Sequence, residues 1–124
     1  MHKLKVLVVD DKRVIGDFFD FTLGYFGHKI TVVHTFEEAI GKIQQQPFDI
    51  AFLDIVMPDK DGVELLKKVK EIAPQLPVVM MSGYSIDEKR TMAQQLGAVE
   101  CLKKPFELED VRRVIKQATG VDIE

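Results

Sequence analysis

The chain has 124 residues, of which 46% are hydrophobic and 30% are charged, and its formal net charge is −3 at pH 7. This length and composition are those of one folded domain with its own core rather than of a disordered chain. The negative net charge argues against nucleic acid as the main partner, and the single cysteine excludes an internal disulfide. The apolar runs are too short for a membrane span and the N-terminus has no signal-peptide pattern, so we expect a cytoplasmic protein without a membrane or nucleic-acid partner.

Five short runs rich in Val, Ile and Leu recur along the chain and predict β-strands. They are Leu4–Val9, Lys29–Val33, Asp49–Leu53, Leu76–Met81 and Val99–Lys103. Most of these runs are almost continuously apolar, which is typical of strands that are covered on both faces.

Helical patterns fill the intervals between the predicted strands. They are Val14–Phe26, a helix opened by a capping box at Thr35–Glu38, a helix after Gly62 that Pro74 stops, a helix from a second capping box at Ser85–Glu88 to about Gly97, and Glu107–Ala118. Alternating strands and helices predict an α/β fold, a single doubly wound (βα)5 domain with a mainly parallel sheet. We expect residues 1–124 to form this one domain.

The first predicted helix is unusually aromatic. Its periodicity places Phe18, Phe21 and Tyr25 on the core-facing side and puts Phe19 and Phe26 towards the edge. A wide buried stripe would explain this pattern. Alternatively, Phe19 or Phe26 contributes to a docking patch for a partner helix.

Side chains that can carry chemistry follow the predicted strands. Asp10 and Asp11 come after the first strand, Asp54 after the third, Ser82 after the fourth and Lys104 after the fifth. The carboxyl ends of parallel strands share one edge of a sheet, and open α/β sheets bind their ligands there. The strand predictions alone therefore bring three carboxylates, a hydroxyl and an ammonium group to one site.

This set of groups favours phosphoryl transfer. Three neighbouring carboxylates repel one another, and a divalent cation relieves that repulsion. Oxygen ligands without His or Cys suit magnesium (Mg²⁺) or Mn²⁺. A lysine and a hydroxyl beside the metal can neutralise and position a phosphoryl group, and an aspartate can accept it. The residues thus predict Mg²⁺-dependent phosphoryl transfer to a carboxylate.

Four motifs resemble the signature of response-regulator receiver domains, in order and over nearly the whole chain. They are Val8-Val9-Asp10-Asp11, Phe52-Leu53-Asp54-Ile55-Val56-Met57-Pro58 with Asp61-Gly62, Met81-Ser82-Gly83, and Lys104-Pro105-Phe106. The resemblance implies the flavodoxin-like strand order 2-1-3-4-5. It also implies a cis peptide bond between Lys104 and Pro105.

The resemblance assigns a role to each matching residue. It makes Asp54 the phosphoacceptor. Asp10, Asp11 and Asp54 become Mg²⁺ ligands together with the backbone carbonyl of Val56. The remaining two site residues, Ser82 and Lys104, would contact the phosphoryl group.

The resemblance also implies partners. A sensor histidine kinase or a histidine phosphotransferase would supply the phosphoryl group from a phosphohistidine. Phosphorylation would then switch the surface formed by the fourth helix, the fifth strand and the fifth helix. Because we expect no output domain in residues 1–124, the output would be contact with a downstream protein or onward transfer.

Several positions depart from the family pattern or modify it. Cys101 stands where the family often has a tyrosine or phenylalanine whose rotamer follows phosphorylation, and we interpret it as a small structural hydrophobe. Val56 cannot orient an attacking water, and Tyr84 would shield the site, so we expect a long-lived aspartyl-phosphate. His28 and His34 have no ligand spacing and are expected to be surface or strand residues, and Asp61 a solvated loop charge.

Two alternatives remain on sequence grounds. One is an interaction module of the same fold that is never phosphorylated. The other is a metal-dependent phosphatase with an aspartate nucleophile, although Asp10-Asp11-Lys12 lacks the Asp-x-Asp spacing of such enzymes. A flavodoxin-type electron carrier is disfavoured because the acidic pair occupies the place of a phosphate-binding loop.

Overall fold

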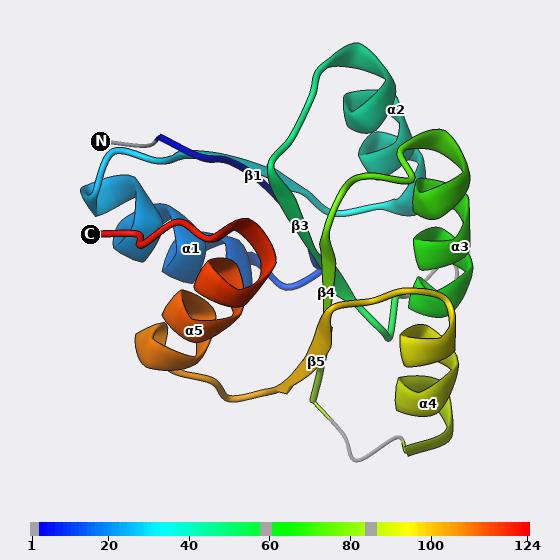
Figure 1. Ribbon diagram of the computed structural model, residues 1–124. Helices are drawn as coiled ribbons and strands as arrows, with labels where there is room; N and C mark the ends of the chain where they lie inside the picture. Colours follow the sequence, from blue (N-terminus) through cyan, green and yellow to red (C-terminus); the bar gives the residue numbers. More distant parts are fainter. Residues whose placement is uncertain (1–2, 58–60, 84–86) are drawn as a thin grey trace.

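A computed structural model describes residues 3–57, 61–83 and 87–124, which form five strands and five helices in strict alternation (Figure 1). The elements are β1 (Lys5–Val9), α1 (Arg13–Tyr25), β2 (Lys29–Val33), α2 (Phe36–Gln45), β3 (Ile50–Asp54), α3 (Gly62–Ile72), β4 (Val78–Ser82), α4 (Asp87–Gln95), β5 (Glu100–Lys103) and α5 (Leu108–Thr119). All strand pairs are parallel, and the strand order is β2-β1-β3-β4-β5. The α/β fold class and the strand order are therefore confirmed.

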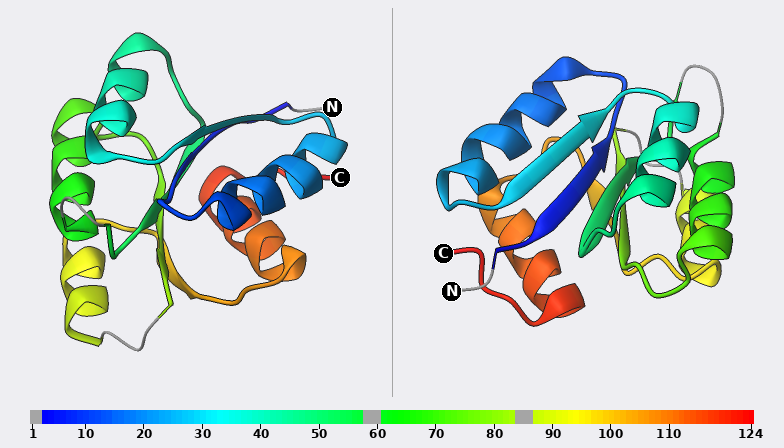
Figure 2. Two further views of the ribbon diagram at one scale, coloured as in Figure 1. Left: turned by 180° about the vertical axis from the view of Figure 1, so that it is seen from behind. Right: turned by 90° about the horizontal axis from the view of Figure 1, so that it is seen from above.

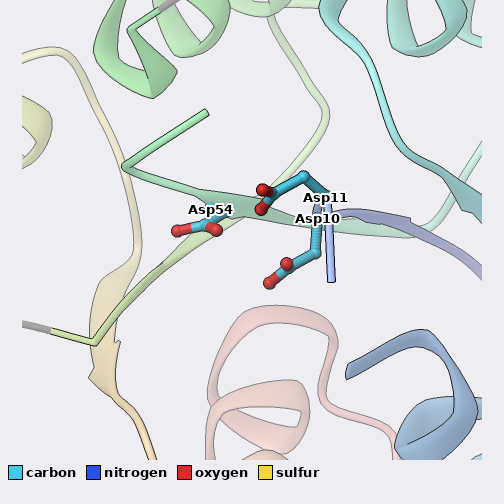
Figure 3. Close-up of side chains that lie close together, drawn as sticks. All are labelled: Asp10, Asp11 and Asp54. Atoms are coloured by element: carbon cyan, nitrogen blue, oxygen red, sulfur yellow. The ribbon is translucent and has the colours of Figure 1, made fainter. Parts of the chain in front are cut away.

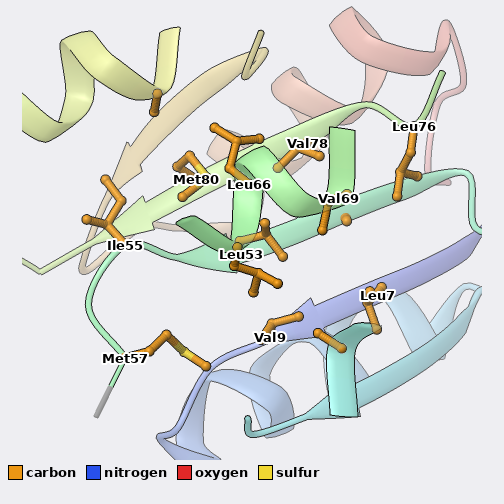
Figure 4. Packing of buried hydrophobic residues seen from close by; sticks show 14 of the residues in the cluster. Leu7, Val9, Leu53, Ile55, Met57, Leu66, Val69, Leu76, Val78 and Met80 are labelled. Atoms are coloured by element: carbon orange, nitrogen blue, oxygen red, sulfur yellow. The ribbon is translucent and has the colours of Figure 1, made fainter. Parts of the chain in front are cut away.

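The sheet separates two layers of helices. Helices α1 and α5 cover one face of the sheet, and α2, α3 and α4 cover the other (Figures 1 and 2). Successive residues of the central strands point into opposite layers, so that Leu7 and Val9 join one core cluster while Val6 and Val8 join the other. Figure 4 shows the first of these clusters, between the sheet and α3. This burial on both faces explains why the strands lack an alternating polar pattern.

The strands end at the residues that carry chemistry. Asp54 and Ser82 are the last residues of β3 and β4, whereas the sequence predicted both strands to end one residue earlier. In the register of the sheet, Val9 of β1 lies beside Leu53 of β3. Parallel pairing therefore carries Asp10 and Asp54 out at the same edge, each directly after buried apolar residues.

The buried face of α1 differs from the predicted face. Phe19 is fully buried, whereas Phe21 and Tyr25 are 81% and 83% exposed. The reason is the close approach of the helix to the sheet at Gly16, where an added Cβ would lie 2.6 Å from the Val32 Cγ1 atom. That contact turns the Gly16–Phe19–Leu23 face inward. The proposed docking role of Phe19 is thereby excluded, because its side chain is inaccessible.

Aromatic contacts attach α1 to the segment that follows β5. The ring of Phe106 lies 5.7 Å from that of Phe18 and 6.0 Å from that of Phe19, and Phe19 contacts Phe52 at 4.7 Å between ring centroids. Edge and tilted ring pairs at these distances are favourable. Phe106 follows Lys104 by two residues, so this packing helps to hold the turn that presents the lysine.

Capping residues define several helix starts. Thr35 accepts a hydrogen bond from the Glu38 N–H at the start of α2, as predicted. At the start of α3, Asp61 accepts one from the Val63 N–H, so the prediction of a solvated loop charge is wrong. The capping box predicted at Ser85 lies outside the described residues. No helix in the described ranges combines the length and apolar character that a bilayer span requires.

His28 is buried and precedes β2, whereas the sequence predicted a surface or strand residue. Its Nδ1 accepts a hydrogen bond from the Leu4 N–H at 3.0 Å, so the proton is on Nε2, which donates to the Ile123 carbonyl at 2.7 Å. The neutral ring therefore joins the start of β1 to the C-terminal segment. Both ring nitrogens are satisfied, which is what allows the side chain to be buried.

Gly62 is the first residue of α3 and lies against the end of β3. An added Cβ would overlap the Asp54 carbonyl oxygen and lie 2.7 Å from the Ile55 Cα atom. The sequence predicted only a turn residue here. The fold requires glycine because two backbone segments meet without room for a side chain.

We expect Gly62→Ala to lower the free energy of unfolding by about 2–3 kcal/mol, because rigid backbone surrounds the new methyl group. Gly41→Ala is the matched control. Gly41 lies within α2 with nothing within 4 Å of an added Cβ, so alanine should stabilise the helix by up to about 1 kcal/mol. Urea denaturation measures both changes, and an equal effect of the two substitutions would contradict the backbone contact.

Candidate functional site

Three aspartates meet at the carboxyl edge of the sheet, where β1 and β3 end (Figure 3). Each of Asp10, Asp11 and Asp54 offers a carboxylate oxygen, and these oxygens all lie within 4.8 Å of one another. Asp10 and Asp54 are buried, whereas Asp11 is exposed. The structure therefore brings together the three carboxylates that the sequence predicted as a metal site.

Asp10 forms hydrogen bonds through both carboxylate oxygens and through its backbone N–H. Its Oδ1 accepts a hydrogen bond from the Lys12 N–H at 2.8 Å, and its Oδ2 accepts one from the Lys104 Nζ at 2.6 Å. Its backbone N–H donates to the Val33 carbonyl at 3.2 Å. This carboxylate is completely removed from solvent, and its charge is compensated inside the protein.

Lys104 joins the site from the segment after β5. Its ammonium group lies 2.6 Å from Asp10 Oδ2 and 3.3 Å from Asp54 Oδ2. Burial by itself would lower the pKa of Lys104, but the hydrogen bond to Asp10 and the negative charges of Asp54 and Asp10 raise the pKa above its ordinary value. The lysine is therefore a permanent cation between two buried carboxylates. The peptide bond between Lys104 and Pro105 is cis, as the resemblance implied.

Asp54 has its two carboxylate oxygens in different environments. Its Oδ1 accepts a hydrogen bond from the Val56 N–H at 3.1 Å, and its Oδ2 faces Lys104. Burial and, after it, the charge of Asp10 raise the pKa of Asp54, while Lys104 and the Val56 N–H oppose that rise. The side chain of Val56 is 43% exposed and apolar. The role of the Val56 carbonyl as a metal ligand stays a prediction.

Ser82 ends β4 and is buried at the same edge of the sheet. Its carbonyl accepts a hydrogen bond from the Lys104 N–H at 2.6 Å, which ties the end of β4 to the segment after β5. Any displacement of Lys104 is therefore coupled to the backbone at Ser82. Contact between the Ser82 hydroxyl and a phosphoryl group stays a prediction, and Tyr84 lies outside the described residues.

The donor set fits a hard divalent cation. Three carboxylates against one ammonium leave two formal negative charges, which such an ion would neutralise. Opposite oxygen ligands of Mg²⁺ are separated by about 4.2 Å, twice its bond length. Oxygens within 4.8 Å of one another can hold the ion after a small contraction, or with one carboxylate bound through water. Asp10, Asp11 and Asp54 are therefore suited to Mg²⁺ or Mn²⁺.

Sequence reasoning missed one residue beside this cluster. His34 is exposed, but its Nδ1 lies 2.9 Å from the backbone carbonyl of Asp10. The register could have indicated this contact, because β1 and β2 pair as far as Val9 and Val33 and the next residues of the two strands are Asp10 and His34. A search for metal-ligand spacing could not find His34, because the histidine binds the backbone carbonyl of Asp10 and is not itself a metal ligand.

Comparison with known proteins gives consistent results over this region. A model of the response regulator receiver domain family matches residues 6–116. The chain is 33% identical over 119 residues to the probable transcriptional regulatory protein TcrX of Mycobacterium tuberculosis, with 94% of this chain and 51% of TcrX covered. It is 28% identical to the transcriptional regulatory protein ZraR of Escherichia coli, with 93% and 26% covered. The chain thus spans about half the length of one relative and a quarter of the other.

Solved structures agree with the sequence relatives. A CheY-like receiver domain protein from Methanospirillum hungatei has a TM-score of 0.91 and 29% identity, covering 96% of this chain and 95% of the other. The receiver domain of NtrX from Brucella abortus has a TM-score of 0.87 and 32% identity, covering 94% and 99%. With its strand order, its acidic cluster and these matches, the chain belongs to the response regulator receiver domain family.

Proposed function

We propose that this receiver domain accepts a phosphoryl group on Asp54 in a Mg²⁺-dependent reaction. The observation that carries the proposal is the convergence of Asp10, Asp11 and Asp54 around one point, with the Lys104 ammonium on two of them. The donor would be a phosphohistidine of a sensor histidine kinase or of a histidine phosphotransferase. Residues 1–124 would together form the receiver, and the signal would pass to a downstream protein target.

The contacts around Asp54 support its role as the nucleophile. An oxygen of its carboxylate would attack phosphorus, forming an O–P bond while the N–P bond of the donor breaks and the imidazole leaves. The Val56 N–H and the Lys104 ammonium already bind the two oxygens and orient the group. Mg²⁺ bound by the aspartates would supply positive charge to the phosphoryl oxygens. Lys104 adds a second positive charge from this chain.

The contacts of Lys104 provide a way in which phosphorylation of Asp54 would change the protein surface. In the unphosphorylated protein its ammonium is shared between Asp10 and Asp54. Formation of the acyl phosphate would remove the charge of the Asp54 carboxylate and bring phosphoryl oxygens to the same place, so Lys104 would exchange a carboxylate for the phosphoryl group. Because its backbone is bonded to Ser82, this exchange would act on the ends of β4 and β5. The surface of α4, β5 and α5 would then change its preferred arrangement.

We expect one phosphoryl adduct on the protein after incubation with phosphoramidate and Mg²⁺, and none on Asp54→Asn. Asp17→Asn is the matched control, because Asp17 is an exposed residue of α1 outside the cluster. Intact-mass spectrometry measures the adduct with Mg²⁺, with Mn²⁺ and with a chelator. An adduct of equal yield on Asp54→Asn would place the phosphoacceptor elsewhere. If no adduct forms with Mg²⁺ and none forms with Mn²⁺, the result would favour an interaction module that is never phosphorylated.

We expect Asp54→Asn to raise the free energy of unfolding in metal-free buffer at neutral pH, by on the order of 1 kcal/mol. Folding raises the pKa of Asp54 above its unfolded value of 3.8, so the folded state binds the proton more tightly. The contribution of Asp54 to stability is thus fully present below that value and is lost as the pH rises through the folded pKa. Removal of the charge should therefore raise the free energy of unfolding at pH 7 and have little effect on it below pH 3.8. Urea denaturation at both pH values tests this, and destabilisation at neutral pH would contradict it.

We also expect the aspartyl-phosphate to be long-lived, because the apolar and half-exposed Val56 cannot orient a water molecule towards it. Val56→Asn should shorten its lifetime by about tenfold or more, since a positioned polar group aids proton transfer. Val56→Ile is the apolar control and should preserve the lifetime. Loss of the adduct is followed by mass spectrometry after removal of the donor. Decay of the wild-type adduct within seconds would show that Val56 does not protect it.

A further inference from the structure

The side chain of His34 contacts the backbone of Asp10. Its Nδ1 lies 2.9 Å from the Asp10 carbonyl oxygen. A carbonyl oxygen can only accept a hydrogen bond, so Nδ1 carries the proton and donates it. The backbone N–H of the same aspartate donates to the Val33 carbonyl. Residues at the end of β2 therefore bind both polar backbone groups of Asp10. The Val33 carbonyl accepts from its N–H, and His34 donates to its carbonyl oxygen.

The carbonyl that His34 binds belongs to the peptide group that leads into Asp11. This group is planar, so the direction of the Asp10 carbonyl also fixes the direction of the Asp11 nitrogen and Cα. Asp11 is the exposed carboxylate of the cluster, and no group in the described ranges donates a hydrogen bond to it. Its place at the site therefore depends on the backbone. A free turn would let Asp11 move away from two carboxylates that repel it.

His34 is itself fixed by the start of α2. Its backbone N–H donates to Glu38 Oε1 at 3.2 Å, and the Thr35 hydroxyl donates to the same oxygen at 3.2 Å. The Glu38 N–H donates in turn to the Thr35 hydroxyl oxygen. The bond to Glu38 anchors the backbone that carries the imidazole. A continuous set of hydrogen bonds thus runs from α2 through His34 to the backbone between Asp10 and Asp11.

We propose that His34 is a positioning residue for the metal site: its Nδ1–H holds the Asp10 carbonyl and thereby places the Asp11 carboxylate for Mg²⁺. This inference rests on the proposed function, because it assumes that Asp11 binds the ion. His34 is not a metal ligand itself, since the group of residues able to share one ion comprises only the three aspartates in the part of the chain that the structure describes. Hydrogen-bonding partners of this kind commonly affect metal affinity strongly.

The test compares His34→Ala with His34→Asn. Alanine removes the donor, whereas the Nδ2 of asparagine can donate from nearly the same place as the Nδ1 of histidine. Titration with Mg²⁺, followed by NMR, should give an affinity about tenfold weaker for His34→Ala and within about twofold of wild type for His34→Asn. In metal-free buffer, the amide resonance of Asp11 should shift in His34→Ala and return towards its wild-type position in His34→Asn.

Thr35→Ala separates this role from a general effect on the fold. It removes the hydroxyl that caps α2 and should lower the thermal midpoint. It leaves both bonds of His34, from its backbone N–H to Glu38 Oε1 and from its Nδ1–H to the Asp10 carbonyl, so Mg²⁺ affinity should stay within about twofold of wild type. Wild-type affinity in His34→Ala, or equal weakening by all three substitutions, would overturn the inference while phosphorylation of the wild type still supports the proposed function. A wild-type protein that binds no Mg²⁺ would overturn both.

Discussion

The site depends on holding three like charges at one edge of a sheet. The carboxylates of Asp10 and Asp54 are buried beside each other, and the Lys104 ammonium contacts both of them. Burial and mutual repulsion raise the pKa of Asp54, and the lysine opposes that rise. Stability alone would favour fewer charges here, and carboxylates perturbed in this way are typical of functional sites. The remaining negative charge suits the site to a divalent ion.

The rest of the fold keeps these charged groups in place. The central strands are buried on both faces, so their ends cannot move without disturbing two core clusters. Gly62 lets the start of α3 lie directly against the Asp54 backbone. On the opposite face, the rings of Phe18, Phe19 and Phe106 fasten α1 to the segment that carries Lys104. Rigid supports of this kind reduce the cost of ordering the site when its ligand binds.

The same arrangement links the site to its surroundings through a few backbone contacts. Lys104 is bonded to the Ser82 carbonyl, and Asp10 is bonded to the end of β2. A change of partner at the Lys104 ammonium would therefore reach two strands and the helices beyond them. The likeness to receiver domains extends over the whole described sheet, while the longer relatives TcrX and ZraR include further sequence beyond the matched part.

The sequence by itself determined the α/β class and the site composition. Strands that are buried on both faces appear in the sequence as continuous apolar runs. The residues that follow such strands lie together at one edge of a parallel sheet. Only the tertiary structure decided which face of α1 is buried, because Phe19 and Phe21 are equally apolar and the choice depends on the close approach at Gly16. The contact of His34 with Asp10 likewise needed the folded chain. Local patterns specify elements, whereas packing between segments distant in sequence specifies contacts.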